Sequence, residues 1–300
     1  DSAVNIASAD TDALSEAVDI TVNDTATVAQ AEFIEARTNS GPNTYSITDS
    51  ATNLAASSNT VLAKASSVSA NTNATQAQAN TIGGFEKAVT YNISDTATNI
   101  AGGNATGRNE AVDITATTSA TISEATTIEG ASNSGSISFN IEDTAAAISG
   151  STNEFLSKTG IGTVTVEGIA LKDQANTIGG FTKAVVFSIS DEAVNVAAIN
   201  SAALNKAVNI STTTSATVAE ATTIDNASNS GSNTYNIEDN GTNIAASSSE
   251  FLAKAGTVTV DGTANIDSLA ADTAAIGDLT DNRVVIAGSS GELEDDANLT

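Results

Sequence analysis

The chain has 300 residues and carries 36 acidic against 10 basic side chains, a formal charge of −26. Because the Lys and Arg residues are few and scattered, no basic stripe is available to neutralise phosphates, which argues against nucleic-acid binding. His and Cys are both absent, which excludes the usual catalytic triads, thiol nucleophiles, disulfides and thiolate metal sites. No run of about 18 apolar residues occurs, so no segment is predicted to span a membrane.

The N-terminal stretch "DSAVNIASAD" opens in the middle of a pattern that recurs further along. We therefore interpret residues 1–16 as the end of a preceding repeat and expect the chain to be an excerpt from a longer protein. Ala, Thr, Ser and Asn dominate, and aromatic residues make up only 3%. Such a composition predicts a thin core of small side chains, as in proteins whose units bury surface only against their neighbours.

Residues 17–262 form a repeat of about 24 residues. Longer segments return after 96 residues, which is four such repeats: "TIGGFEKAV" (81–89) as "TIGGFTKAV" (177–185), and "EATTIEGASNSGSISFNIED" (124–143) as "EATTIDNASNSGSNTYNIED" (220–239). Near-constant spacing of this kind indicates a repeat architecture. The residues that close the short apolar strands of successive repeats are Asp24, Asp49, Asn73, Asp95, Ser119, Asp143, Gly168, Asp191, Ser215, Asp239 and Gly262.

Within each repeat, a short strand is followed by a polar residue and an Ala-rich segment such as "EAVNVAAINSAALNKA" (192–207). This order predicts an α/β solenoid of about ten coils, with one parallel strand and one short helix in each coil. The alternative is an all-β parallel helix, in which "ATVAEATTI" (216–224) is a second strand. Six of the seven lysines support the helical version, because they lie where the helices should end and would interact with the helix dipoles. They are Lys64, Lys87, Lys158, Lys183, Lys206 and Lys254.

The segment "YNISDTATNIA" (91–101) recurs in alternate coils and carries an acidic residue at a fixed place. We predict that this Asp is the N-cap of the following helix and accepts hydrogen bonds from the first turn. Ser119 and Ser215 stand at the equivalent place in other coils, and Ser replaces Asp readily as a cap but not as a general base. The predicted structural caps are Asp49, Asp95, Asp143, Asp191 and Asp239.

An Asn follows the Asp after four residues in four of these copies, with Ala147 in the fifth. We predict that it faces inward and bonds backbone groups of the adjacent coil. The aromatic residues at the start of the motif are expected to stack from coil to coil: Tyr91, Phe139, Phe187 and Tyr235. The Asn residues are Asn53, Asn99, Asn195 and Asn243.

The sequence predicts no catalytic, cofactor or metal site. Neither the calcium-binding glycine-rich nonapeptide, the EF-hand loop nor a phosphate-binding glycine motif occurs. The acidic run "ELEDDANL" (292–299), with Glu292, Glu294, Asp295 and Asp296, is interpreted as a solvated face and not as a calcium site. The carboxylates of the repeats recur in register, so they form no unique acid and base pair. The protein is therefore not expected to be an enzyme.

The C-terminal part departs from the repeat. Residues 263–300 are predicted to form a linker and a β-hairpin that lead to a following domain. The hairpin is expected in "LTDNRVVIAGSSGELEDDANLT" (279–300), as a strand, a Gly-Ser-Ser-Gly turn and a polar strand.

The repeat phrase resembles the "SDTAANIA" repeats of very large bacterial surface and secreted proteins and of some long phage proteins, over about residues 17–262. The C-terminal segment resembles one found in structural proteins of marine phages, especially cyanophages. These resemblances imply a virion tail fibre or appendage that forms homo-oligomers, such as trimers, and contacts other virion proteins. The host surface would be recognised by regions outside this segment. The alternative they imply is an extracellular or cell-surface bacterial adhesin or surface-layer protein that binds glycans or calcium.

Overall fold

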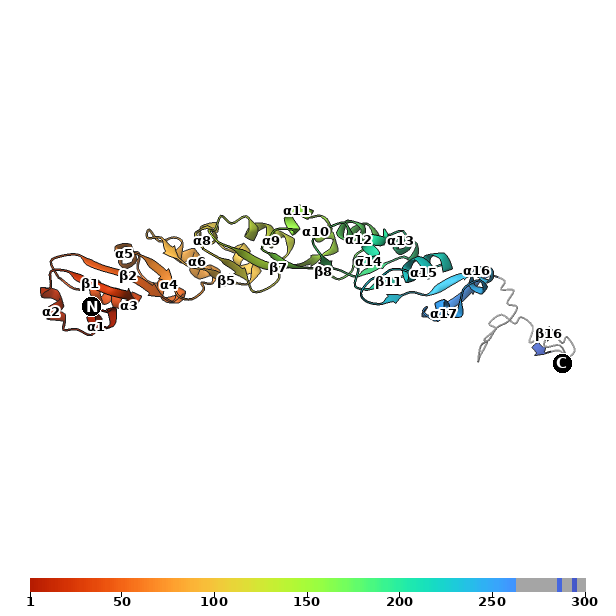
Figure 1. Ribbon diagram of the computed structural model, residues 1–300, viewed down its shortest axis with the longest axis horizontal. Helices are drawn as coiled ribbons and strands as arrows, with labels where there is room; N and C mark the ends of the chain where they lie inside the picture. The colour runs from red at the N-terminus through yellow and green to blue at the C-terminus, as the bar shows by residue number, and fades with distance from the viewer. Residues whose placement is uncertain (263–284, 288–292, 296–300) are drawn as a thin grey trace.

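The computed structural model describes residues 1–262, 285–287 and 293–295. Strands and helices alternate along the sequence, and the strands of residues 20–261 pair in parallel. The chain is thus a mixed α/β protein with parallel sheets, as predicted. Its elements follow one another along the long axis of an elongated molecule (Figure 1).

We call each strand segment, with the helices that follow it, a unit. Two kinds of unit alternate, with one helix or with two. The one-helix units are β1 (Ile20–Ala26) with α3 (Val28–Glu35), β3 (Val68–Ala70) with α6 (Gln76–Ile82), β6 (Ile114–Ala116) with α9 (Ile122–Glu129), β8 (Ile161–Glu167) with α12 (Lys172–Gly179), and β11 (Ile210–Thr212) with α15 (Val218–Asp225).

The two-helix units begin with one longer strand or with two short ones. They are β2 (Asn43–Asp49), α4 (Ala51–Ala56) and α5 (Asn59–Lys64); β4 (Val89–Thr90), β5 (Ile93–Asp95), α7 (Ala97–Gly102) and α8 (Ala105–Glu110); β7 (Ile137–Thr144), α10 (Ala145–Ser149) and α11 (Asn153–Leu156); β9 (Val185–Val186), β10 (Ile189–Asp191), α13 (Ala193–Ala197) and α14 (Ser201–Lys206); and β12 (Asn233–Thr234), β13 (Ile237–Asn240), α16 (Gly241–Ala245) and α17 (Ser249–Leu252). Helices α1 (Ala3–Ala7) and α2 (Thr11–Glu16) precede β1, and β14 (Val258–Asp261) follows α17.

The prediction of one helix per repeat is therefore wrong for every second unit. In the segment 192–207, Asn200 is the N-cap of α14 and accepts a hydrogen bond from Ala203 N. Asn104 begins α8 in the same way, after Gly103 has ended α7. Residues that cap a new helix thus divide the predicted segment, because Asn and Gly favour helix ends over helix interiors.

The all-β alternative is also wrong. Apart from its first residue, Ala216, the stretch "ATVAEATTI" that it required as a strand lies in the N-cap and body of α15. Thr217 is the N-cap, and Glu220 three residues later accepts a hydrogen bond from Thr217 N, which is a capping box.

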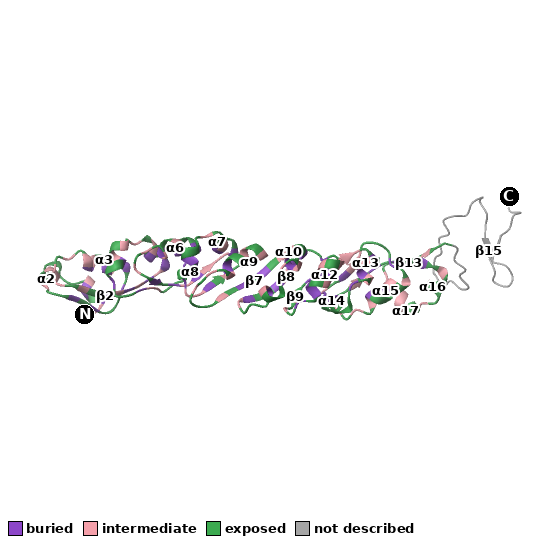
Figure 2. Ribbon diagram, turned by 90° about the horizontal axis from the view of Figure 1, so that it is seen from above, coloured by how far each residue is buried: buried purple, intermediate pink, exposed green. Residues whose placement is uncertain are grey.

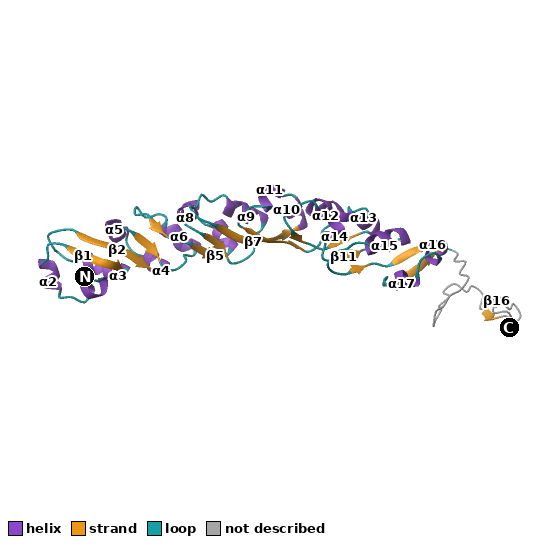
Figure 3. Ribbon diagram, in the orientation of Figure 1, coloured by secondary structure: helices purple, strands orange, loops and turns teal. Residues whose placement is uncertain are grey.

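The core lies between the strands and the helices, and its buried hydrophobic residues extend from Ala3 to Ile237 (Figure 2). Helices α16 and α17, at the C-terminal end of the repeats, contain no buried residue. Side chains alternate in and out along the strands, so Ile47, Ile93 and Ile189 are buried and pair in register with Val68, Ile114 and Ile210 of the next unit. The helices contribute mainly Ala, Ile and Leu. In the middle of the molecule, α9 and α10 pack against β7 (Figure 3).

The aromatic side chains are buried, but they do not stack on one another in neighbouring units. Tyr91, Phe139, Phe187 and Tyr235 all lie in two-helix units, so a one-helix unit always separates two of them. The Tyr91 hydroxyl instead donates to the carbonyl oxygen of Gly107 in its own unit, at 2.7 Å.

Near the C-terminus, β15 (Val285–Ala287) pairs antiparallel with β16 (Leu293–Asp295), within the segment predicted as a hairpin. The predicted boundary near Thr263, and most of the acidic run 292–299, lie outside the described residues.

Candidate functional site

The Asp of the repeated motif is not the N-cap of the helix that follows it. The caps are the next residues in the chain, such as Ser50 for α4 and Thr96 for α7, whose hydroxyls accept hydrogen bonds from the amides of Asn53 and Asn99. The prediction that the Asp caps the following helix is therefore wrong. Its carboxylate does accept an amide at the start of a helix, but that helix belongs to the preceding unit.

Asp95 shows the arrangement. Its Oδ2 accepts a hydrogen bond of 2.9 Å from the amide of Gln76, the first residue of α6 in the unit before. Its Oδ1 accepts one of 2.8 Å from Thr96 N. The first-turn amides of a helix have no partner within the helix, so each Asp satisfies one of them across a unit boundary. The same 2.9 Å contact joins Asp49 to Val28, Asp143 to Ile122, Asp191 to Lys172, and Asp239 to Val218.

The Asn of the motif holds this carboxylate and does not bond the next unit. Asn99 Nδ2 donates to Asp95 Oδ1 at 2.8 Å, and the Asn99 side chain is exposed. The prediction that these residues face inward and connect adjacent coils is therefore wrong. Where Ala147 replaces Asn, Asp143 still accepts the amides of Ile122 and Thr144. The equivalent side-chain contacts join Asn53 to Asp49, Asn195 to Asp191 and Asn243 to Asp239.

These contacts lower the pKa of four of the carboxylates below its usual value. Burial by itself raises the pKa of Asp49, Asp95 and Asp191, but the donated hydrogen bonds from backbone amides and from the Asn side chain outweigh it. For Asp239, the Val218 amide is the largest cause, and it lowers the pKa. A carboxylate that accepts several N–H groups is held ionised, which fits a structural acceptor and not a proton donor near neutral pH.

In most one-helix units, a side chain that follows the strand also accepts the first helix amide of the preceding unit. Thr118 Oγ1 accepts a hydrogen bond of 3.0 Å from Ala97 N, the first amide of α7 in the preceding unit. Gly168 occupies this place after β8 with φ +82°, a left-handed conformation that suits glycine. Ser119 and Ser215, predicted as caps, are exposed and do not cap a helix. The equivalents of Thr118 are Asp24, Thr72 and Thr214, which accept from Ala3, Ala51 and Ala193.

A capping signal that sequence analysis missed was present in the chain. Threonine followed by Gln or Glu after three residues marks the true N-cap of four one-helix units. In α9, Glu124 N donates to Thr121 Oγ1 and Thr121 N donates to Glu124 Oε2. The other pairs are Thr27 with Gln30, Thr75 with Gln78, and Thr217 with Glu220.

Four of the six lysines predicted at helix ends contact the helix of the preceding unit: Lys64, Lys158, Lys206 and Lys254. Lys158 lies 3.2 Å from Glu129, the last residue of α9, and Lys254 lies 2.9 Å from Asp225 at the end of α15. Lys206 donates to the carbonyl oxygen of Gly179 at 2.7 Å. For these four lysines the predicted interaction with helix ends involves the helix of the neighbouring unit, in addition to the lysine's own helix in the cases of Lys64 and Lys206. The prediction is wrong for Lys87 and Lys183, which lie outside helices and donate to the carbonyl oxygens of Ser66 and Ile161.

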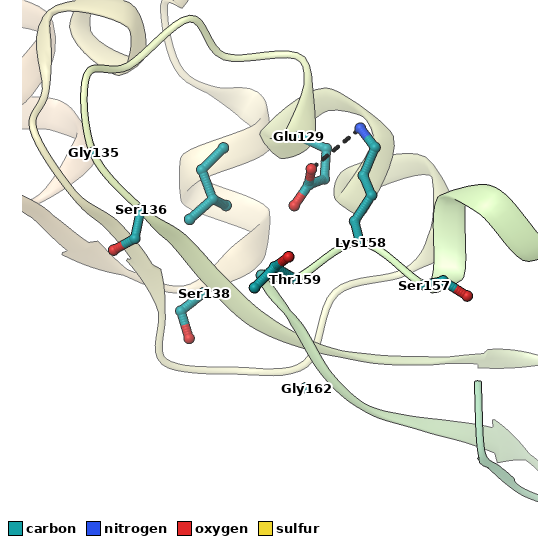
Figure 4. Close-up of a pocket in the computed structure, with 10 residues that line it drawn as sticks. Glu129, Gly135, Ser136, Ser138, Ser157, Lys158, Thr159 and Gly162 are labelled. Carbon is teal, nitrogen blue, oxygen red and sulfur yellow. Dashed lines mark ion pairs between the residues drawn. The ribbon is translucent and has the colours of Figure 1, made fainter. Parts of the chain in front are cut away.

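A surface depression of about 700 Å³ lies between the end of α9, the start of β7 and the loop from α11 to β8 (Figure 4). The ion pair of Glu129 and Lys158 forms part of its lining, together with Ser and Thr hydroxyls and glycine backbone. Smaller depressions beside the Asp and Asn pairs recur along the molecule, but there the carboxylates already accept backbone amides.

In residues 1–262, no group of three or more Asp and Glu side chains is arranged to hold a metal ion. None of the helices described is both long and apolar enough to cross a bilayer. Comparisons with protein-family models, with curated proteins and with solved structures find no match to the chain.

Proposed function

We propose that the chain is a stretch of α/β solenoid that serves as a non-enzymatic rod segment in a phage tail fibre or comparable virion appendage. Its role would be to hold a host-recognition tip, located outside this segment, at a distance from the particle. The observation that carries this proposal is the series of 2.9 Å contacts from each motif Asp to the helix of the preceding unit.

Such contacts favour stiffness along the long axis. Parallel strand pairing joins each unit to the next, and the Asp and Thr acceptors tie the helical layer together at the same boundaries. In a repeat protein, stability is close to a sum of unit and interface terms, so a boundary with several independent bonds resists local opening. The carboxylates are engaged by amides, which supports a structural role over a catalytic one.

The excess of negative charge supports a role at an exposed surface. A net charge of −26 keeps an elongated, Ala-rich protein soluble and discourages nonspecific association. We expect self-association and attachment to other virion proteins to use specific surfaces, and we expect no nucleic-acid partner and no membrane insertion.

The proposal is tested by immunogold labelling of virions and host cells with antibodies against this segment. Label along a virion appendage is the expected result. Label confined to the host cell surface would contradict it and would favour the bacterial adhesin or surface-layer protein.

A further inference from the structure

One two-helix unit is longer than the others. In these units a strand isoleucine pairs with the residue 21 positions later, as Ile47 does with Val68 and Ile189 with Ile210. Ile141 instead pairs with Val164, 23 positions later. The two extra residues fall in "KTGIGTV" (158–164), where the equivalent segment 96 residues on reads "KAGTV" (254–258).

This insertion lies at the large depression of Figure 4, where Thr159, Gly160 and Gly162 are part of the lining. Gly160 is required by close approach, because a Cβ there would overlap the backbone carbonyl oxygen of Ile137. A Cβ at Gly162 would overlap only Asn140 Oδ1, at the end of a side chain. The inserted backbone therefore lies directly against β7. Insertions in repeat proteins commonly lie in loops on one face, which is often the binding face.

The lining offers hydrogen-bonding groups without net charge. Ser138, Ser157 and Thr159 are exposed, and their hydroxyls make no hydrogen bond within the described part of the chain. The Lys158 ammonium is neutralised by Glu129 at 3.2 Å and also lies over the Phe155 ring. The half-buried side chain of Ile137 adds a small apolar area.

We propose that this depression binds an uncharged saccharide. Sugar hydroxyls both donate and accept, which matches the Ser and Thr hydroxyls and the two ends of the ion pair, and a sugar's C–H face can cover Ile137. The volume lies within the range of about 300–1,000 Å³ that is usual for small-molecule sites.

Other ligand classes fit less well. An anion would meet a lysine that is already paired and the repulsion of a strongly acidic chain. A metal cation would find a single carboxylate, Glu129, in the lining. A wholly apolar ligand would displace water from three hydroxyls and offer them no hydrogen bonds in its place.

The test uses the full chain and saturation-transfer NMR with maltose, cellobiose, lactose and N,N′-diacetylchitobiose as probes, and sialyllactose as an anionic comparison. We expect at least one neutral probe to bind. Ser138→Trp should abolish that binding, because Ser138 is an exposed strand position whose enlarged side chain would fill the depression. The matched control is Thr234→Trp, which places the same side chain at the position 96 residues on, beside a unit without the insertion.

A second variant deletes Ile161 and Gly162 and so restores the length seen at 254–258. It should also lose binding, and circular dichroism would show that it remains folded. No binding of any neutral probe would overturn the proposal. Equal loss in Ser138→Trp and Thr234→Trp, or stronger binding of sialyllactose, would overturn it as well. None of these outcomes bears on the rod function, which labelling of virions tests separately.

Discussion

The two-helix units around Asp95 and Asp143 share a fold but differ in how many contacts hold it. Asp95 accepts the amide of Gln76 and the side chain of Asn99, and Thr118 of the next unit accepts the amide of Ala97.

Asp143 keeps only the corresponding contacts to backbone amides, of Ile122 and Thr144. Ala147 replaces the Asn, and Gly168 replaces the Thr. The strand register nevertheless continues through both units, apart from the insertion. The contact from Asp to the preceding helix is therefore the common requirement, and the Asn and Thr contacts add to it.

The largest effect is expected from acid, because it acts on several of these carboxylates together. Their pKa is lowered in the folded protein, so the stability they contribute is full above the unfolded value near 3.9 and is lost as the pH falls through the folded pKa. We expect the melting temperature, measured by circular dichroism, to decrease when the pH is lowered below about 4.

High salt provides the control for this experiment, since protonation also removes net negative charge and salt screens that repulsion at every pH. A melting temperature that is the same at pH 5 and at pH 2 would contradict the role of the carboxylates.

Replacing a single Asp tests the common requirement directly. Asp95→Ala should cost about 2 kcal/mol, since it leaves the Gln76 amide without its acceptor. The distinctive expectation is that hydrogen exchange accelerates in α6, the helix of the preceding unit, and not only in α7. Asp143→Ala should behave alike at α9 with a smaller cost, because no Asn side chain loses its partner. Glu142→Ala is the matched control at an exposed neighbouring position, and exchange changes confined to the mutated unit would argue against the model of capping across units.

Exchanging the residues at Thr118 and Gly168 separates hydrogen bonding from backbone conformation. Thr118→Val removes the acceptor of Ala97 N and should cost about 1 kcal/mol. Gly168→Thr, which restores the residue found in the other unit, should also destabilise by about 1–2 kcal/mol, because the φ of +82° is unfavourable for a residue with a Cβ. Urea unfolding measures both, with Thr118→Ser as the control that keeps the hydroxyl. A stabilising Gly168→Thr would show that the backbone there adapts readily.

The smallest effect concerns the Asn. Asn99→Ala should lose about 0.5 kcal/mol, since an exposed hydrogen bond to a carboxylate contributes little beyond its replacement by water. Ala147→Asn should gain a similar amount, because it completes the arrangement seen in four other copies. Thermal unfolding of both variants and of the wild type measures whether each substitution raises or lowers the stability. A loss of stability in Ala147→Asn would show that the unit around Asp143 holds its carboxylate differently.

The strands and the alternation of strand and helix could be predicted from the sequence, because apolar periodicity and repeat length report them directly. The division of 192–207 into two helices was also signalled, by the cap residue Asn200. The sequence did not indicate which helix amide the Asp95 carboxylate accepts. Its partner Gln76 is 19 residues earlier, and only the arrangement of the units in the fold brings that amide to 2.9 Å from the Asp95 carboxylate. The identity of the true caps was available in the pairs Thr75–Gln78 and Thr121–Glu124. The depression at 158–162 could be noticed as extra length but not located on a face.

The side chains that accept the first amide of a helix across a unit boundary lie later in the chain than that helix. Asp95 accepts the amide of Gln76 in α6, and Thr118 accepts the amide of Ala97 in α7. Lys158 likewise contacts Glu129 at the end of the earlier helix α9. During synthesis, when N-terminal parts emerge first, each unit would remain incomplete until about 20 further residues have left the ribosome, and would then be closed by its successor. The first amides of the helices would thus gain their acceptors in the order of translation, with only those of the most recently synthesised unit still without a partner.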